Sequence, residues 1–224
     1  MCITRLAVAA CALLAVSGCA PTSLTLRDSL AAAPDCCARE RDFRYQALGL
    51  GERVKVELGA ASPAHAFSTG KSYYAAFRLP PQPRPLTVQV RSIISGGITL
   101  AEAYLFYPVV AVLDADYGSR LVVSVPPDKV SAAVKDDFFA GVVLDLSVPI
   151  VAGDTFVVLY SDARLLGQTF RFERHTTNTR TVYYPGGSML VTDPVHVQAD
   201  IPYAAGGKVE VRLVEPGSKQ DNSQ

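Results

Sequence analysis

The sequence predicts an all-β protein built as a single β-sandwich, either jelly-roll-like or immunoglobulin-like. Apolar and polar residues alternate with a period of two along many short segments, and turn signals separate these segments at steps of about ten residues. Many short strands with frequent turns are typical of sandwiches. We expect the sandwich to occupy residues 36–214, because no linker rich in Gly, Ser or Pro divides this span.

The chain opens with the pattern of a lipoprotein signal peptide. Arg5 precedes an apolar run from Leu6 to Val16, which has the length of a signal-peptide core and is too short to span a bilayer. Val16-Ser17-Gly18-Cys19 then forms a lipobox, the pattern that is cut before a cysteine that receives acyl chains. Residues 1–18 are therefore predicted to be the signal peptide, and Cys19 the lipidated first residue of the mature protein.

The two ends of the mature chain are expected to lie outside the sandwich. Residues 19–35 are predicted to be the lipidated cysteine and a tether, because the segment after Cys19 is small, polar and bounded by prolines. Residues 215–224 contain no apolar anchor and are predicted to be disordered.

The strands follow from the alternation. Half-buried strands are predicted at residues 54–58, 86–90, 121–125, 142–148 and 209–213. Two segments are apolar on both faces and are expected to be central strands: residues 103–113, in which Pro108 marks a bulge or the start of a strand, and residues 155–160. The best helix candidate, residues 128–139, is short and poorly patterned.

Two adjacent cysteines need an explanation in an oxidising periplasm, where free thiols are uncommon. Neighbouring Cα atoms lie about 3.8 Å apart, below the usual disulfide separation of about 4.4–6.8 Å. A disulfide between Cys36 and Cys37 would therefore impose a tight turn on residues 35–38. The sequence leaves three fates open: this vicinal disulfide, two free thiols, or bridges to other chains.

Charge and motifs argue against several classes of function. The chain has 21 basic and 21 acidic residues, so it lacks the electrostatic footprint of a nucleic-acid-binding protein. Gly186-Gly187-Ser188 lacks the final glycine of a serine-hydrolase elbow and is interpreted as a hairpin turn. Gly70-Lys71-Ser72 lacks the glycine that should come five positions earlier in a phosphate-binding loop, and it is interpreted as a turn before a strand.

Metal binding finds no better support. Asp114 and Asp116 resemble the start of a calcium loop, but Gly118 stands where a third oxygen ligand is needed, so a hairpin turn is expected. His65, His175 and His196 are not at ligand spacing along the chain. No catalytic residue, metal site or cofactor is therefore predicted.

The tyrosines are a stronger lead. The chain has ten tyrosines and no tryptophan. Most are expected to pack in the core or at the rim of a sheet, with the hydroxyl reaching a partner. Tyr183 and Tyr184, beside Pro185-Gly186, are the candidate platform on which a sugar or a peptide would stack.

Several motifs in residues 36–165 occur in a recognisable order. Cys36-Cys37 is followed by Ser62-Pro63-Ala64-His65, by a strand that ends in Leu79-Pro80, and by Phe106-Tyr107-Pro108-Val109 leading to Leu113-Asp114. In this order the chain resembles the maltose operon periplasmic protein family. The resemblance implies a secreted β-sandwich whose namesake members are encoded beside genes for maltose and maltodextrin uptake. It carries over no catalytic residue, and the paired cysteines depart from the enterobacterial pattern.

These observations predict a non-enzymatic lipoprotein of the periplasm. Ala20 rather than Asp follows Cys19, which favours the outer membrane under enterobacterial sorting. The expected role is carbohydrate handling by binding, at a tyrosine-lined edge or beside Cys36-Cys37. The alternative is a scaffolding lipoprotein that contacts another envelope protein by edge-strand addition or through its loops. The expected partners are thus the membrane, through the lipid, and a glycan or an envelope protein.

Overall fold

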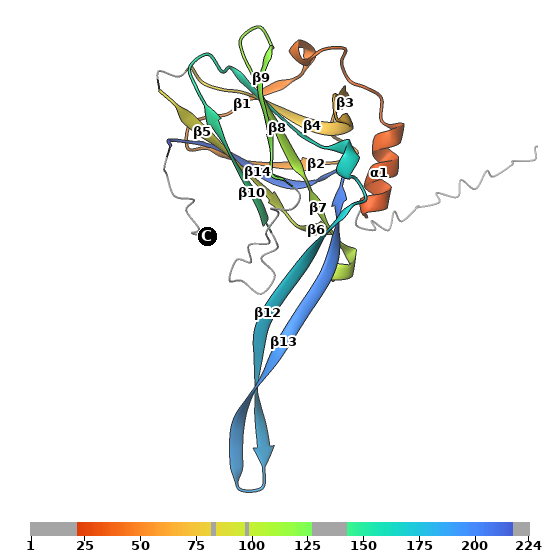
Figure 1. Ribbon diagram of the computed structural model, residues 1–224, viewed down its shortest axis with the longest axis vertical. Coiled ribbons are helices and arrows are strands. Elements are labelled where there is room, and N and C mark those ends of the chain that lie inside the picture. The colour runs from red at the N-terminus through yellow and green to blue at the C-terminus, as the bar shows by residue number, and fades with distance from the viewer. Residues whose placement is uncertain (1–21, 82–83, 97–98, 127–142, 217–224) are drawn as a thin grey trace, which may run out of the picture.

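The protein is a β-sandwich, as the alternation predicts (Figure 1). The computed structural model describes residues 22–81, 84–96, 99–126 and 143–216. One sheet has the strand order β1-β4-β11-β8-β9, with β3 also paired to β4. Its strands are β1 (Tyr45–Ala47), β3 (Ala64–Phe67), β4 (Gly70–Arg78), β8 (Pro108–Leu113), β9 (Ser119–Ser124) and β11 (Phe156–Ser161).

A second, antiparallel sheet covers one face of the first. Its strand order is β10-β5-β14-β2. The strands are β2 (Arg53–Leu58), β5 (Leu86–Ile93), β10 (Val143–Ile150) and β14 (Gly207–Val214). Alternation positions each residue as predicted: in β5, Leu86, Val88 and Val90 are buried while the residues between them are half-buried. These side chains meet Val112 and Leu159 of the first sheet in the main core.

The first sheet is buried on its other face as well. Every residue of β8 and β11 is buried, which confirms central strands at residues 108–113 and 156–161, within or overlapping the two apolar segments. A second core cluster on this face joins Tyr74 and Val158 to Phe43, Phe170 and Tyr203. A sheet covered on both faces needs continuous apolar runs rather than alternation, and this is what the two segments show.

The prediction of one strand over residues 103–113 is wrong. The chain forms β7 (Ala103–Phe106), passes Tyr107 and begins β8 at Pro108 in a different sheet. β7 pairs with β13 and β6. Proline lacks an amide hydrogen and is therefore tolerated as the first residue of a strand, which is one of the two roles expected of Pro108.

The prediction that residues 19–35 are only a lipidated cysteine and a tether is also wrong. Helix α1 (Ser23–Ala32) begins after Thr22, whose hydroxyl accepts a hydrogen bond from the Thr25 amide in a capping box. Leu26 and Leu30, four positions apart, lie on one face of the helix and belong to the main core. The helix is thus part of the folded domain. Short 3-10 turns occupy Glu40–Asp42, Leu100–Glu102 and Ala163–Leu165.

A long β-hairpin projects from the sandwich (Figure 1). It consists of β12 (Thr169–Tyr184) and β13 (Gly187–Ala204), which pair in antiparallel register from Thr169 opposite Pro202 to Tyr184 opposite Gly187. We call β12 and β13 together the arm. With β7 and β6 (Ser95–Gly96) it forms the third sheet, in the order β12-β13-β7-β6.

Several predictions concern residues outside the described ranges. The signal peptide, Cys19, the helix candidate at 128–139 and the tail from residue 217 all lie there. None of the helices in the part that the structure describes is long and apolar enough to cross a membrane.

Candidate functional site

Cys36 and Cys37 form a disulfide, so the first of the three fates left open by the sequence is the one that the structure adopts. The segment is held against β3, because Asp35 forms a bridge with Ala64 and the Cys36 amide donates to the Ala64 carbonyl at 2.8 Å. The Cys37 carbonyl lies 3.1 Å from Nδ1 of His65. Since a carbonyl can only accept, this ring nitrogen carries the hydrogen. The disulfide lies at the surface, with Cys36 exposed and Cys37 half-buried.

A buried tyrosine supports the disulfide from below. The Tyr74 hydroxyl lies 2.8 Å from Sγ of Cys36 and 3.6 Å from Sγ of Cys37. A disulfide sulfur carries no hydrogen, so the hydroxyl is the donor. Burial raises the pKa of Tyr74 to about 12, against a smaller opposing effect of Arg44. The hydroxyl therefore keeps its hydrogen, and the bond to sulfur, at neutral pH.

Aromatic rings continue beneath the disulfide. Phe43 stacks on Tyr74 with ring centroids 4.2 Å apart and meets the edge of His65 at 5.0 Å. Phe67 stacks on Tyr160 at 3.9 Å. These contacts fill the outer face of the first sheet, so the rings serve packing rather than open stacking on a ligand.

Beside the disulfide lies an open hollow of about 630 Å³. Its lining includes Asp35, Cys37, Glu40 and His65. The carboxylate of Asp35 is paired with Lys71, at 3.5 Å. The hollow thus combines a disulfide surface with acidic and imidazole side chains, a set that can hydrogen-bond hydroxyl groups.

The arm carries the other candidate residues at its end. Tyr183 is 80% exposed and Tyr184 is 52% exposed. Both lie next to the two-residue turn that joins β12 to β13, where Gly186 has φ +116°. The interpretation of this segment as a hairpin turn is therefore confirmed, and the glycine is needed because side chains rarely adopt that φ. The tyrosines stand apart from the disulfide, so the structure does not unite the two candidate sites.

Most other tyrosines are packed, as expected. Tyr73, Tyr74, Tyr104, Tyr107, Tyr160 and Tyr203 are all at most 5% exposed. The pKa of Tyr203 is raised to about 12 by burial and, second, by Tyr107. Among the described tyrosines, those at the end of the arm are therefore the ones that a ligand or partner reaches most easily.

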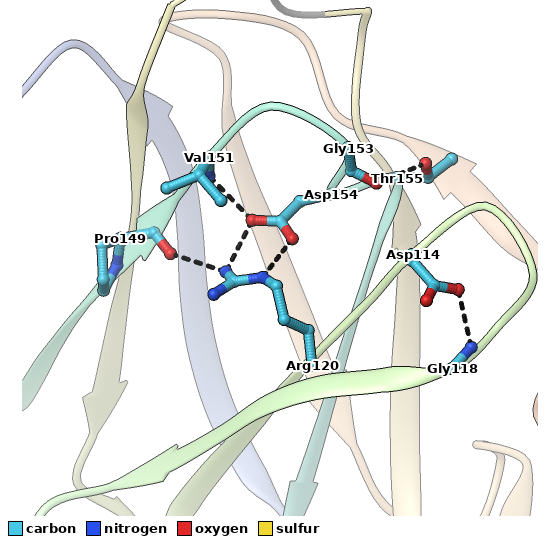
Figure 2. A network of polar contacts seen from close by, with 8 residues as sticks. All are labelled: Asp114, Gly118, Arg120, Pro149, Val151, Gly153, Asp154 and Thr155. Carbon is cyan, nitrogen blue, oxygen red and sulfur yellow. Dashed lines mark hydrogen bonds and ion pairs between the residues drawn. The ribbon is translucent and has the colours of Figure 1, made fainter.

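The loop that contains Asp114 and Asp116 is the hairpin turn between β8 and β9, as predicted. Asp114 Oδ1 accepts hydrogen bonds from the amides of Asp116 at 2.9 Å and Gly118 at 2.8 Å, so the backbone of its own loop occupies this oxygen. Figure 2 shows the bond to Gly118. The same view shows the Arg120 guanidinium of β9 donating hydrogen bonds to the carboxylate of Asp154, with Nη2 2.6 Å from Oδ2. The Val151 amide also donates to Oδ2, at 2.7 Å. This network joins β9 to the loop between β10 and β11 and is structural.

The arm also brings together residues that are distant in the sequence. Its register places His175 directly opposite His196, although 20 residues separate them along the chain. Among the side chains that the structure describes, no three histidines, cysteines or acidic residues are grouped to hold a metal.

The sequence contains a signal for the arm. Val195-His196-Val197-Gln198-Ala199-Asp200-Ile201 alternates as a strand does, and Pro185-Gly186 supplies the turn. Alternation does not show that this strand of 18 residues extends out of the domain. How far a strand projects depends on where the adjacent strands of the sheet end.

Taken together, the fold and these sites define a β-sandwich protein with a surface disulfide and a projecting β-hairpin. No protein-family model matches the chain, and no curated protein matches it significantly. Among solved structures, the chain is similar to the pre-peptidase C-terminal domain of a collagenase from Bacillus anthracis. The identity is 8% and the TM-score 0.32, over 77% of this chain and 98% of that one. A likeness at this level carries no argument about function.

Proposed function

We propose that this protein is a non-enzymatic, lipid-anchored protein of the periplasm that acts by contact, with the arm as its contact element. The arm is the observation that carries the proposal. Its strands have 16 and 18 residues, but only its base joins the core, where Phe170, Phe172 and Ile201 are buried. Val197 and Ala199 also pack against this core, but none of the arm residues described between positions 177 and 195 belongs to either core cluster. The length of the arm is therefore better explained by something that it reaches.

The arm has the features of a strand-addition surface. β12 is an edge strand along its whole length, and β13 pairs with β7 only at Tyr203 and Ala204. An exposed edge offers a row of free amide and carbonyl groups to a further strand. Prolines interrupt β13 at positions 194 and 202, whereas β12 contains none. β12 therefore presents the continuous edge, and this supports a scaffolding role towards another component of the envelope.

Photo-crosslinking in intact cells tests this role. A photo-reactive amino acid at Thr177, exposed on β12, should give one dominant adduct with another envelope component. The same amino acid at Arg53, exposed on the outer strand β2 of the second sheet, is the matched control. Adducts of equal yield from both positions, or none from any position on β12, would contradict the proposed role of the arm.

The lipid anchor and the location are part of the proposal. They are supported by the lipobox at Cys19 and by the disulfide, because disulfides persist in oxidising compartments. Mass spectrometry of the N-terminal peptide should find acyl groups on Cys19 and no residues before it. An unprocessed or unacylated N-terminus would contradict this part.

The second candidate function is carbohydrate binding, as the resemblance to the maltose operon periplasmic family implies. The surface disulfide favours it, because Cys37 lines the hollow together with Asp35, Glu40 and His65, which can hydrogen-bond hydroxyl groups. Calorimetry with maltose and longer malto-oligosaccharides should give saturable heat that the double variant Cys36→Ser, Cys37→Ser loses. Absence of heat at millimolar ligand would remove this candidate and leave the arm as the site of function.

A further inference from the structure

The end of the arm differs in composition from the rest of it. Residues 181–192, which we call the arm tip, contain no charged side chain. Below the tip, Arg180 and Asp193 form an ion pair at 3.1 Å, and the hydroxyls of Thr179 and Thr192 lie 3.1 Å apart. The last charges before the tip are therefore paired with each other, and nothing charged lies beyond them.

The arm tip is apolar on both faces. Val182 is opposite Met189, and both are on one face of the ribbon; Tyr183 and Leu190 are on the other. The exposed fractions are 37% for Val182, 80% for Tyr183, 53% for Met189 and 72% for Leu190. Exposed apolar groups on every side of a projecting element require an explanation, since isolated domains seldom gather them.

In the shaft of the arm, residues 169–180 and 193–204, the valines of β13 share one face with Phe170 and Phe172 of β12. Val195, Val197 and Ala199 share one face and are half-buried, whereas His196 and Gln198 on the other face are exposed. Glu173, opposite Gln198, continues the polar face. Val197 and Ala199 pack against the second core cluster, so the chain itself covers part of this apolar face. A ribbon that packs on protein needs only one apolar face, but a ribbon surrounded by lipid meets apolar atoms on all sides.

We propose that the arm tip enters a lipid bilayer at the boundary between headgroups and acyl chains. This inference rests on the proposed function of the arm as a contact element, and it names lipid as what the tip contacts. Tyrosines favour this boundary because the ring is apolar while the hydroxyl stays hydrated. The absence of charge between the Arg180–Asp193 pair and the turn removes the main cost of entry.

The geometry limits the depth of insertion. At about 3.3 Å per residue, the tip extends about 15 Å from its base, roughly half of the ~30 Å hydrocarbon core. Backbone groups on the outer edges of a two-stranded ribbon have no partner, and hydrocarbon cannot hydrate them. The tip therefore anchors in one leaflet and does not cross the bilayer.

The position of the arm agrees with the lipid anchor. The N-terminal end of α1 is the end of the helix nearer the base of the arm (Figure 1). Cys19 precedes Thr22 by three residues, a span of at most about 11 Å. The shaft strand of residues 193–204 spans about 40 Å, so the acyl chains and the arm tip would hold the domain at two points only with the arm inclined towards the membrane plane, which would fix its orientation.

Fluorescence quenching tests the inference in the full chain as purified from membranes and reconstituted in phosphatidylcholine vesicles. The chain has no tryptophan, so Leu190→Trp places a single reporter in the arm tip. Gln198→Trp is the matched control on the same strand and the same face, below the ion pair. Bromine on the acyl chains should quench Leu190→Trp at least twofold more than Gln198→Trp. Tyr183→Trp is the second reporter if Leu190→Trp fails to fold.

The outcomes separate the inference from the proposed function. Preferential quenching at the tip supports insertion, and Leu190→Asp beside a Tyr183→Trp reporter should then abolish it. Equal or absent quenching at both positions overturns the inference. If β12 still gives a dominant protein adduct in cells, the arm keeps its proposed role and its tip contacts protein instead; if it gives none, both proposals fall.

Discussion

The two side chains of the ion pair between Arg120 and Asp154 differ in exposure, so truncating Arg120 should lower the free energy of unfolding more than truncating Asp154. The Asp154 side chain is 1% exposed and that of Arg120 is 37% exposed. Truncating Arg120 leaves a buried carboxylate that keeps the Val151 amide as a donor. Breaking a buried pair costs about 3–5 kcal/mol, and we expect about 3 kcal/mol for Arg120→Ala because the site opens to solvent on the arginine side.

The reverse truncation should cost less. In Asp154→Ala the Arg120 guanidinium can turn into water, so the loss is that of the hydrogen bonds and of a partner for the Val151 amide, about 2 kcal/mol. The double variant leaves no charge buried and should also lose about 2 kcal/mol. Asp154→Ala is thus expected to restore about 1 kcal/mol of the free energy of unfolding that Arg120→Ala removes.

Urea unfolding at neutral pH, with the slope of free energy against urea compared between variants, measures these differences. Lys55→Ala is the control, because Lys55 meets Glu210 at 3.8 Å with 78% of its side chain exposed, and such surface pairs contribute at most about 1 kcal/mol. A double variant less stable than Arg120→Ala would refute the reasoning, because it would show that the unpaired carboxylate is not the source of the cost.

Three further predictions follow from the site and the core. Leu30→Ala should lower the free energy of unfolding by about 2–4 kcal/mol, since Leu30 is buried in the main core; a change below about 0.5 kcal/mol in urea unfolding would mean that α1 is not part of the domain. Cys36→Ser with Cys37→Ser should change it by less than about 1 kcal/mol, because the disulfide joins adjacent residues and closes almost no loop. If the double serine variant lost more than about 2 kcal/mol of the free energy of unfolding while Tyr74→Phe lost none, that expectation would be contradicted. The pKa of Tyr74 is raised to about 12 from an ordinary value of 10.0, so its contribution to stability is complete below pH 10 and is lost as the pH rises towards 12. Ultraviolet titration of tyrosinate should show a late-ionising group that Tyr74→Phe removes, and its absence would contradict the burial of the hydroxyl.

The alternation of apolar and polar residues predicts the sandwich strands well, because the face on which a strand residue lies depends only on its neighbours along the same strand. Val88 and Val90 face the core since the residues between them face outward, whatever the order of the strands. The turn at Pro185-Gly186 and the backbone capping by Asp114 are likewise local, since both depend on residues within a few positions.

The candidate site was only partly predictable. Adjacent cysteines could be recognised as a candidate disulfide, but the support from Tyr74 comes from a residue 38 positions away. Exposed tyrosines could be suspected at Tyr183 and Tyr184 because of the adjacent turn, whereas the burial of Tyr107 and Tyr203 depends on two sheets meeting. Composition does not distinguish these cases.

The sequence by itself determined the β-class, the positions of most strands and turns, the lipobox and the pairing choice open to Cys36 and Cys37. Only the tertiary structure decided that residues 23–32 are a packed helix, that the chain changes sheets at Tyr107, and that β12 and β13 leave the domain as an arm. The physical reason is that periodicity reports which side of an element is apolar, while burial depends on what covers that side. Leu26 and Leu30 are covered by the core, and Tyr183 and Leu190 are covered by no described element of this chain.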